Sequence, residues 1–200
     1  PHAEEASMEA LEALAPRDEE DLAALLRGSG LEPARYGSGA AKPLAGLLAE
    51  IERGECSLRR AAGGSLERLV EPVFVRLWWG DRVLVEVEQR FGDGRRRQRN
   101  MVLAEKRSPE DADADAAALR GLAEELELEL EPEGLRRLVE FDRDSCACVA
   151  ERRESPSYPG LQCVYHTHNL AMRLTEAGEA HFGGRGLLEE RFETSDADKV

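Results

Sequence analysis

Long apolar runs and aromatic residues are both scarce in this sequence of 200 residues. No apolar stretch approaches the roughly 18 residues that a membrane-spanning helix requires, and no charged-then-apolar leader opens the chain. We therefore expect a soluble protein without a membrane span, while peripheral association with a membrane stays open. A chain of this length can bury one substantial core, with or without a small appended helical segment, so the sequence predicts one or two domains.

Basic residues are few relative to acidic ones. The chain has 27 lysines and arginines against 41 aspartates and glutamates, which gives a formal net charge of −14. A broad electrostatic hold on nucleic acid or on an anionic membrane requires a basic surface, so the composition argues against both. Only a local basic patch could reverse that conclusion, and we expect protein partners in a larger complex instead.

Cysteine is scarce as well, and the chain has only four: Cys56, Cys146, Cys148 and Cys163. They are too few and too unevenly placed for the disulfide framework of a small secreted domain. An intracellular, reducing compartment is therefore expected.

Two short motifs offer ligands of the kind that bind zinc. Cys146-x-Cys148 and Cys163-x-x-His166-x-His168 place five thiols and imidazoles on two strands that could pair. Neither spacing is that of a standard zinc knuckle, and alternate strand residues that face one core explain the first motif equally well. We therefore do not expect a bound zinc ion.

The sequence divides into three parts. Residues 1–20 are acidic and alanine-rich, which predicts a flexible arm or docking tail. Residues 21–65 form a helical extension, with amphipathic helices predicted at 19–27 and 43–53, each followed by glycine. The remaining residues, 66–200, form the main domain.

The apolar period changes to that of strands after Leu66. A hairpin is predicted from Val70 to Glu88 with its turn at Gly80-Asp81, and a helix runs from the 108–113 turn to about Leu128. Further strands are predicted at 101–103, 135–141, 145–152 and 161–174. This order predicts an α+β fold with a mixed sheet.

The segment from Lys106 to Leu128 resembles the Nudix box. Its pattern is a glycine, five residues, a glutamate, seven residues, and then Arg-Glu-aliphatic-x-Glu-Glu-x-Gly-aliphatic. The matching residues are Arg120, Leu122, Glu124, Glu125 and Leu128. The wider chain, roughly 40–195, resembles uncharacterised Nudix-like proteins of plants and algae. The stretches that carry this likeness are Leu84-Val85-Glu86, Asp93-Gly94-Arg95, Glu105-Lys106, Glu124-Glu125-Leu126, Tyr158-Pro159-Gly160-Leu161 and Phe192-Glu193-Thr194.

The resemblance implies a Nudix-like α/β/α sandwich around a mixed β-sheet, here with an N-terminal helical extension. It also implies an organellar, chloroplast location. The family closes with a helix after its last strand, which the sequence does not reveal here, and the N-terminal helices could cover that face instead.

The chain departs from the box at four positions. Lys106 replaces the leading glycine, Ala112 the first glutamate, Gly121 the glutamate after the arginine, and Glu127 the late glycine. Glycine inside a helix costs about 1 kcal/mol relative to alanine, and the sequence gives no reason for Gly121.

In Nudix hydrolases the box glutamates hold magnesium against a diphosphate. The resemblance thus implies that Glu124 and Glu125 would hold the metal here, with Asp111 or Asp113 assisting and Arg120 orienting the glutamates. Because the chain lacks two box acids, the first hypothesis is a non-catalytic Nudix-like binding or structural subunit, with no cofactor or a weakly bound magnesium ion. The alternative is a divergent magnesium-dependent hydrolase of nucleoside diphosphate-linked compounds. A solvated ion pair between Arg120 and Glu124 explains the same residues without any metal.

A second candidate surface is basic and aromatic. Four arginines follow a second turn at Phe91-Gly92-Asp93-Gly94, and they could meet phosphate or an acidic partner, or could pair with the protein's own carboxylates. Of the two tryptophans, one is expected in the core and the other on the surface. The partner-binding candidates are Arg95, Arg96, Arg97, Arg99 and Trp79.

Overall fold

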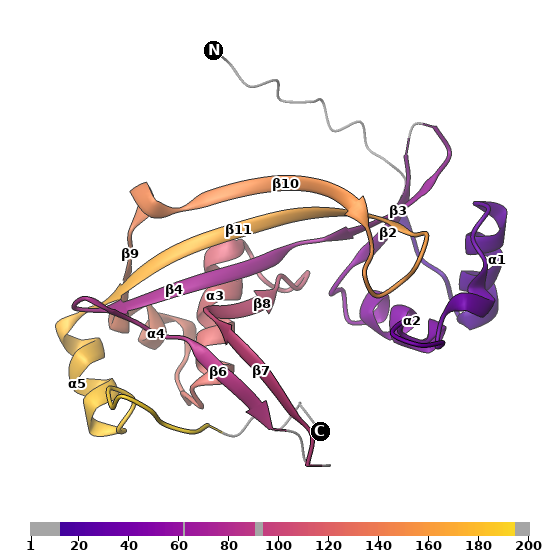
Figure 1. Ribbon diagram of the computed structural model, residues 1–200. Coiled ribbons are helices and arrows are strands. Elements are labelled where there is room, and N and C mark those ends of the chain that lie inside the picture. Colours follow the sequence, from indigo (N-terminus) through magenta and orange to yellow (C-terminus); the bar gives the residue numbers. More distant parts are fainter. Residues whose placement is uncertain (1–12, 62, 91–93, 195–200) are drawn as a thin grey trace. The chain divides into compact units, whose positions relative to one another are not determined.

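The computed structural model describes residues 13–61, 63–90 and 94–194 (Figure 1). It confirms the predicted α+β class, because helices alternate with a mixed set of parallel and antiparallel strands. No helix in these ranges is long and apolar enough to cross a membrane. The chain forms two compact units. Unit 1 contains Pro1–Glu71 and Ala150–His166, and unit 2 contains Pro72–Val149 and Thr167–Val200.

Unit 1 combines helices with a small sheet. Its sheet has the order β1-β2-β3-β11, with antiparallel pairs except for the parallel pair of β3 and β11. Both helices predicted here are confirmed, and Asp18 caps the first by accepting a hydrogen bond from the Asp21 N–H at 2.8 Å. The elements are β1 (Ala13–Leu14), α1 (Glu19–Gly28), the short 3-10 helix η1 (Pro33–Arg35), α2 (Leu44–Glu52), β2 (Ser57–Arg60), β3 (Leu66–Val70) and the first part of β11 (Gln162–Leu174).

The core of unit 1 contains a polar cluster inside an apolar shell. Leu22, Leu47 and Leu58 are fully buried and bring α1, α2 and β2 together. Among them, the buried Glu50 carboxylate accepts hydrogen bonds from Arg68 and, at 3.1 Å, from the Tyr158 hydroxyl.

Unit 2 is built around β4 and the second part of β11, which pair in parallel. β9 lies on the other side of β11, while β8 and β5 pair antiparallel with the two ends of β4. β6 and β7 form a separate two-stranded sheet. The elements are β4 (Pro72–Trp79), β5 (Arg82–Val83), β6 (Glu86–Arg90), β7 (Arg96–Met101), β8 (Leu103–Lys106), α3 (Ala114–Glu125), α4 (Pro132–Leu138), β9 (Val139–Phe141), the 3-10 helix η2 (Arg143–Ser145) and α5 (Glu176–Gly184); β10 (Ala147–Glu154), like β11, contributes to both units.

The alternation of buried and half-buried residues along β4 shows which of its faces points to the core of unit 2. Val73, Val75 and Leu77 are buried, while the residues between them are half-buried, as expected for a strand with one face toward a core. The buried face meets Leu122 of α3 and Phe182 of α5 in one cluster. All three helices of unit 2 contribute to this core.

Toward the end of the chain, one prediction was wrong and one question that the sequence left open has an answer. Residues 135–138 belong to α4 rather than to a strand, because Pro132 opens a helix and the spacing of Leu135 and Leu138 suits either period. A helix does follow the last long strand. This is α5, which begins after Thr175, whose hydroxyl caps it by accepting a hydrogen bond from the Gly178 N–H at 3.1 Å. The sequence did not predict this helix because glycine is unfavourable inside helices.

Gly178 has a packing reason, since a Cβ atom there would lie 2.0 Å from the Leu138 carbonyl oxygen. Gly178→Ala should therefore lower the free energy of unfolding by about 3 kcal/mol or more, measured by urea denaturation. The matched control is Gly183→Ala in the exposed part of the same helix, where a Cβ atom meets nothing closer than 3.7 Å. It should raise stability by about 0.5–1 kcal/mol through helix propensity. Equal effects of the two changes would contradict this packing.

Candidate functional site

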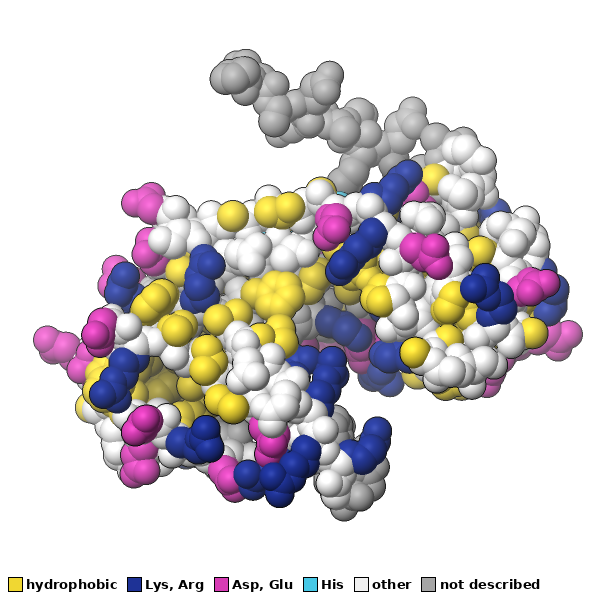
Figure 2. All heavy atoms as spheres, viewed as in Figure 1, with side chains coloured by type: hydrophobic (Ala, Val, Ile, Leu, Met, Phe, Trp, Pro, Cys, Tyr) yellow, Lys and Arg dark blue, Asp and Glu magenta, His cyan; other side chains and the backbone are white. Residues whose placement is uncertain are grey.

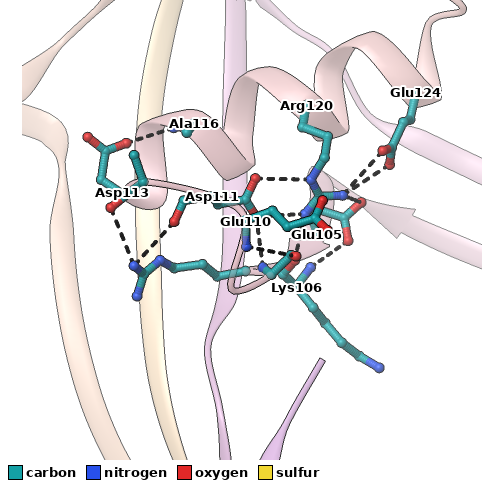
Figure 3. A network of polar contacts seen from close by, with 11 residues as sticks. Glu105, Lys106, Glu110, Asp111, Asp113, Ala116, Arg120 and Glu124 are labelled. Atoms are coloured by element: carbon teal, nitrogen blue, oxygen red, sulfur yellow. Dashed lines mark hydrogen bonds and ion pairs between the residues drawn. The ribbon is translucent and has the colours of Figure 1, made fainter. Parts of the chain in front are cut away.

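The segment from Lys106 to Leu128 forms the end of β8, the loop after it and α3, which packs against β8 and β4. The Asp113 carboxylate caps the helix by accepting a hydrogen bond from the Ala116 N–H at 2.8 Å. Asp113 is therefore occupied as a capping residue, one turn away from the cluster described next (Figure 3).

Close packing explains Gly121. A Cβ atom at this position would lie 3.0 Å from Cβ and 3.2 Å from Cγ of Glu105 on β8. The glutamate that the Nudix pattern has here could not fit without moving the strand or the helix. The absent side chain is thus a condition for the contact between α3 and β8.

Arg120 is the centre of a polar cluster, shown in Figure 3. Its Nε and Nη2 donate to the two carboxylate oxygens of Asp111 at 3.1 and 3.0 Å, in a bidentate pair. Its Nη1 lies 3.2 Å from Glu124 Oε2 and 3.5 Å from Glu105 Oε2. Nη2 also donates to the Lys106 carbonyl at 2.8 Å. One guanidinium therefore joins β8, the following loop and α3.

Within this cluster, the pKa values of Asp111 and Glu105 are shifted in opposite directions. Burial alone would raise the pKa of Asp111, but hydrogen bonds from Arg120 and from the Ser108 N–H reverse this and hold the pKa below its usual value. Burial raises the pKa of Glu105, and the nearby Glu124 adds to this, against the opposing effects of the Lys106 N–H and Arg120. The pKa of Asp111 therefore lies below its usual value, and that of Glu105 lies above it.

The structure brings together three of the predicted site residues. Arg120, Asp111 and Glu124 are in direct contact, and Glu125 lies one position further along α3, half-buried against Glu105 and Leu103. In the described part of the chain, no group of three or more histidine, cysteine, aspartate or glutamate residues could hold a metal ion.

Glu105 is the site residue that sequence reasoning missed. It is at the end of a short strand and outside the matched part of the box, so no spacing pointed to it. The stretch Glu105-Lys106 is among those that carry the wider resemblance, but nothing in the sequence assigned a role to the Glu105 side chain.

Glu127 has a backbone conformation that favours glycine. Its φ is +52°, in the left-handed region, directly after the end of α3. The resemblance assigns a glycine to this same position. Glu127 therefore has a backbone conformation that glycine adopts more readily than glutamate.

None of the four cysteines, all of which lie in the described ranges, forms a disulfide bond. Cys163 is buried in unit 1, with its sulfur 3.5 Å from Arg68 Nη1. In unit 2, Cys146 is half-buried and donates to the Asp142 carbonyl at 3.2 Å, while Cys148 is exposed.

The predicted partner-binding arginines lie on or beside β7. Arg99 is paired with Glu86 at 2.9 Å, and Arg96 lies 3.6 Å from Glu88. Arg95 and Arg97 are exposed. Trp79 on β4 is half-buried, and so is Trp78, so the expected division into one core and one surface tryptophan was wrong. Arg82 stacks on Trp79, with its guanidinium carbon 5.4 Å from the ring centre.

Comparison of the chain with protein-family models, curated proteins and solved structures found no match.

Asp111→Asn should lower the free energy of unfolding by about 1–2 kcal/mol at pH 7, because it replaces a buried carboxylate paired with a partly exposed arginine. The folded-state pKa of Asp111 lies below the unfolded value of about 4. Its contribution is therefore present above that unfolded value and is lost as pH falls through the folded one.

Urea denaturation at pH 7 and at progressively lower pH measures this difference. The gap between the native protein and Asp111→Asn should narrow below about pH 4. The exposed neighbour Glu110 supplies the control, and Glu110→Gln should change stability by no more than about 0.5 kcal/mol. A gap that is independent of pH would show that the carboxylate charge does not matter.

Glu127→Gly should raise the free energy of unfolding by about 1 kcal/mol, since glycine adopts the left-handed conformation without steric strain. Glu127→Ala removes the same side chain but keeps the strain, so it should give no comparable gain. Thermal and urea unfolding of both variants measure this, and an equal gain in both would attribute the effect to the side chain instead.

Proposed function

We propose that this chain is a non-catalytic Nudix-like module that serves as a binding or structural subunit of a larger, organellar assembly. The observation that carries the proposal is the position of Arg120, whose guanidinium is the cation around which Asp111, Glu105 and Glu124 gather. The likeness to Nudix-like proteins of plants and algae supports the organellar location.

The contacts of Asp111 argue against a role as a metal ligand. Both of its oxygens accept hydrogen bonds from Arg120, one of them also accepts from the Ser108 N–H at 2.7 Å, and the residue is 6% exposed. Magnesium requires a nearly octahedral shell of oxygens and gives up its water reluctantly. To use Asp111, it would have to displace a bidentate arginine pair.

The packing of α3 argues in the same direction. A Cβ atom at Gly121 would lie 3.0 Å from Cβ of Glu105, so the box glutamate would require Glu105 or the helix to shift by a few tenths of an ångström. A phosphoryl-transfer site depends on metal ions to neutralise the charge that develops on the phosphate. The helix has fewer acids than such a site requires, and Arg120 already pairs with one of them. This favours a structural role over catalysis.

The proposal predicts no magnesium-dependent turnover. Purified protein with millimolar magnesium or manganese should release no more phosphate from a panel of nucleoside diphosphate-linked compounds than Glu124→Gln does. Glu129→Gln, which changes an exposed glutamate beyond the helix, is the matched control. Turnover that is lost in Glu124→Gln and kept in Glu129→Gln would overturn the proposal.

One observation favours the alternative, a divergent diphosphate hydrolase. Glu105 brings a carboxylate from β8 to the side of Gly121, close to Glu124, and so offers an acid where the helix lacks one. In this reading, Glu105 would join Glu124 and Glu125 around a magnesium ion only after these side chains move, because they do not form a metal site where they lie in the described structure. Calorimetric titration with magnesium separates the two functions, because only the hydrolase requires binding that is weakened in Glu105→Gln.

A further inference from the structure

Three exposed valines lie at alternate positions of the segment that forms β5 and β6. Val83, Val85 and Val87, here called the valine stripe, are 36%, 43% and 37% exposed. Leu84 and Val85 lie between the two strands, which belong to different sheets, so the shared exposure of the three valines defines the stripe. Leu84, between them, packs against the core of unit 2 and donates its N–H to the Leu77 carbonyl at 2.9 Å. The stripe therefore faces away from that core.

The stripe holds most of the large exposed apolar side chains. In the described ranges, the only other one is Val149. A strand face in contact with water normally carries polar residues, and β-branched apolar residues there indicate a binding surface.

Charges on the other face of the β6–β7 hairpin are satisfied internally. Glu86 pairs with Arg99 at 2.9 Å. Glu88 accepts from Arg90 at 2.8 Å and from the Gln98 side chain at 2.7 Å. This face therefore has little charge left to offer a partner.

The valine stripe, by contrast, is next to an uncompensated positive charge. Gln89, two residues beyond Val87, is directly opposite Arg97 in the strand register, so both lie on the face of the stripe. Arg97 is exposed and makes no ion pair with any residue for which the structure gives a position. Lys and Arg side chains gather over this hairpin in Figure 2.

At its other end the stripe meets an aromatic residue. Val83 is opposite Trp78 of β4 in the register, and Arg173 lies over the Trp78 ring with its guanidinium carbon 5.9 Å from the centre. Tryptophan and arginine are enriched at the centres of protein interfaces.

The hairpin also has an open edge. β6 and β7 form a sheet of two strands, and no other strand in the described part of the chain pairs with β6. An extended peptide can add to such an edge by main-chain hydrogen bonds, with alternate side chains on the neighbouring face.

We infer that the valine stripe is a docking surface for an extended, acidic segment of a partner protein with apolar side chains at alternate positions. Charge complementarity with Arg97 selects the acidic partner, while the valines supply apolar contact. Valine offers no ring on which nucleic acid bases could stack, so the apolar contact favours a peptide over a nucleic acid. The inference rests on the proposed interaction function, of which it names the surface and partner class.

The test uses the full chain and a fluorescently labelled peptide of about nine residues that alternates glutamate with valine. Fluorescence anisotropy should show saturable binding that weakens with salt. Two further peptides, one alternating lysine with valine and one alternating glutamate with serine, should bind at least about tenfold more weakly, because each lacks one component of the recognition.

Variants of the protein then test whether the peptide binds at the valine stripe. The triple change Val83→Thr, Val85→Thr and Val87→Thr keeps shape and strand propensity and should weaken binding at least about tenfold, and Arg97→Glu should weaken it similarly. Val149→Thr, at the other exposed valine, should leave affinity within about twofold. Circular dichroism of each variant confirms that it is folded.

Several results would overturn the inference. These are absence of saturable binding to the glutamate–valine peptide, equal binding by the triple variant, or equal binding of the lysine–valine peptide. The inference would also be overturned if the protein self-associates and the triple change abolishes this, or if a single-stranded oligonucleotide displaces the peptide. Phosphate release in the hydrolysis assay would overturn the proposed function without affecting peptide binding, so the two failures are distinguishable.

Discussion

The guanidinium of Arg120 joins a strand, the loop after it and a helix of unit 2. It contacts Glu105 at the end of β8, Asp111 in the loop and Glu124 on the same helix. Without these contacts, three acids would face one another beside a half-buried strand. The helix approaches that strand closely only because Gly121 lacks a side chain. The charge cluster and the close packing therefore depend on each other.

Unit 1 contains a comparable arrangement with the charges reversed. There the buried Glu50 carboxylate is the centre, and it accepts hydrogen bonds from Arg68, from Tyr158 and, at 2.7 Å, from Lys42. These residues come from α2, from β3 and from the two loops that meet at Tyr158 and Lys42. Breaking a buried pair costs more than the pair contributes, so such clusters favour one specific arrangement of elements. Each unit thus has its own polar centre inside an apolar shell.

Sequence reasoning worked where the signals are local. The helices at Glu19–Gly28 and Leu44–Glu52 have their caps and apolar stripes within the segment itself, and β11 has a long run of strand formers. It failed at α4 and α5. The apolar spacing of α4 suits two periods, and the glycine content of α5 reflects contact with Leu138 rather than a loop. The reason for that glycine lies far away in the chain.

The sequence by itself determined the α+β class, the acidic charge, the order of most elements and the spacing of Arg120, Glu124 and Glu125 on one helix. These follow from residue periodicity and composition, which are local properties. Only the tertiary structure decided that Glu105 joins the cluster, that Glu127 is left-handed and that three valines face away from the core. Each of these depends on how a helix or strand is oriented against its neighbours, and no short stretch of sequence encodes that orientation.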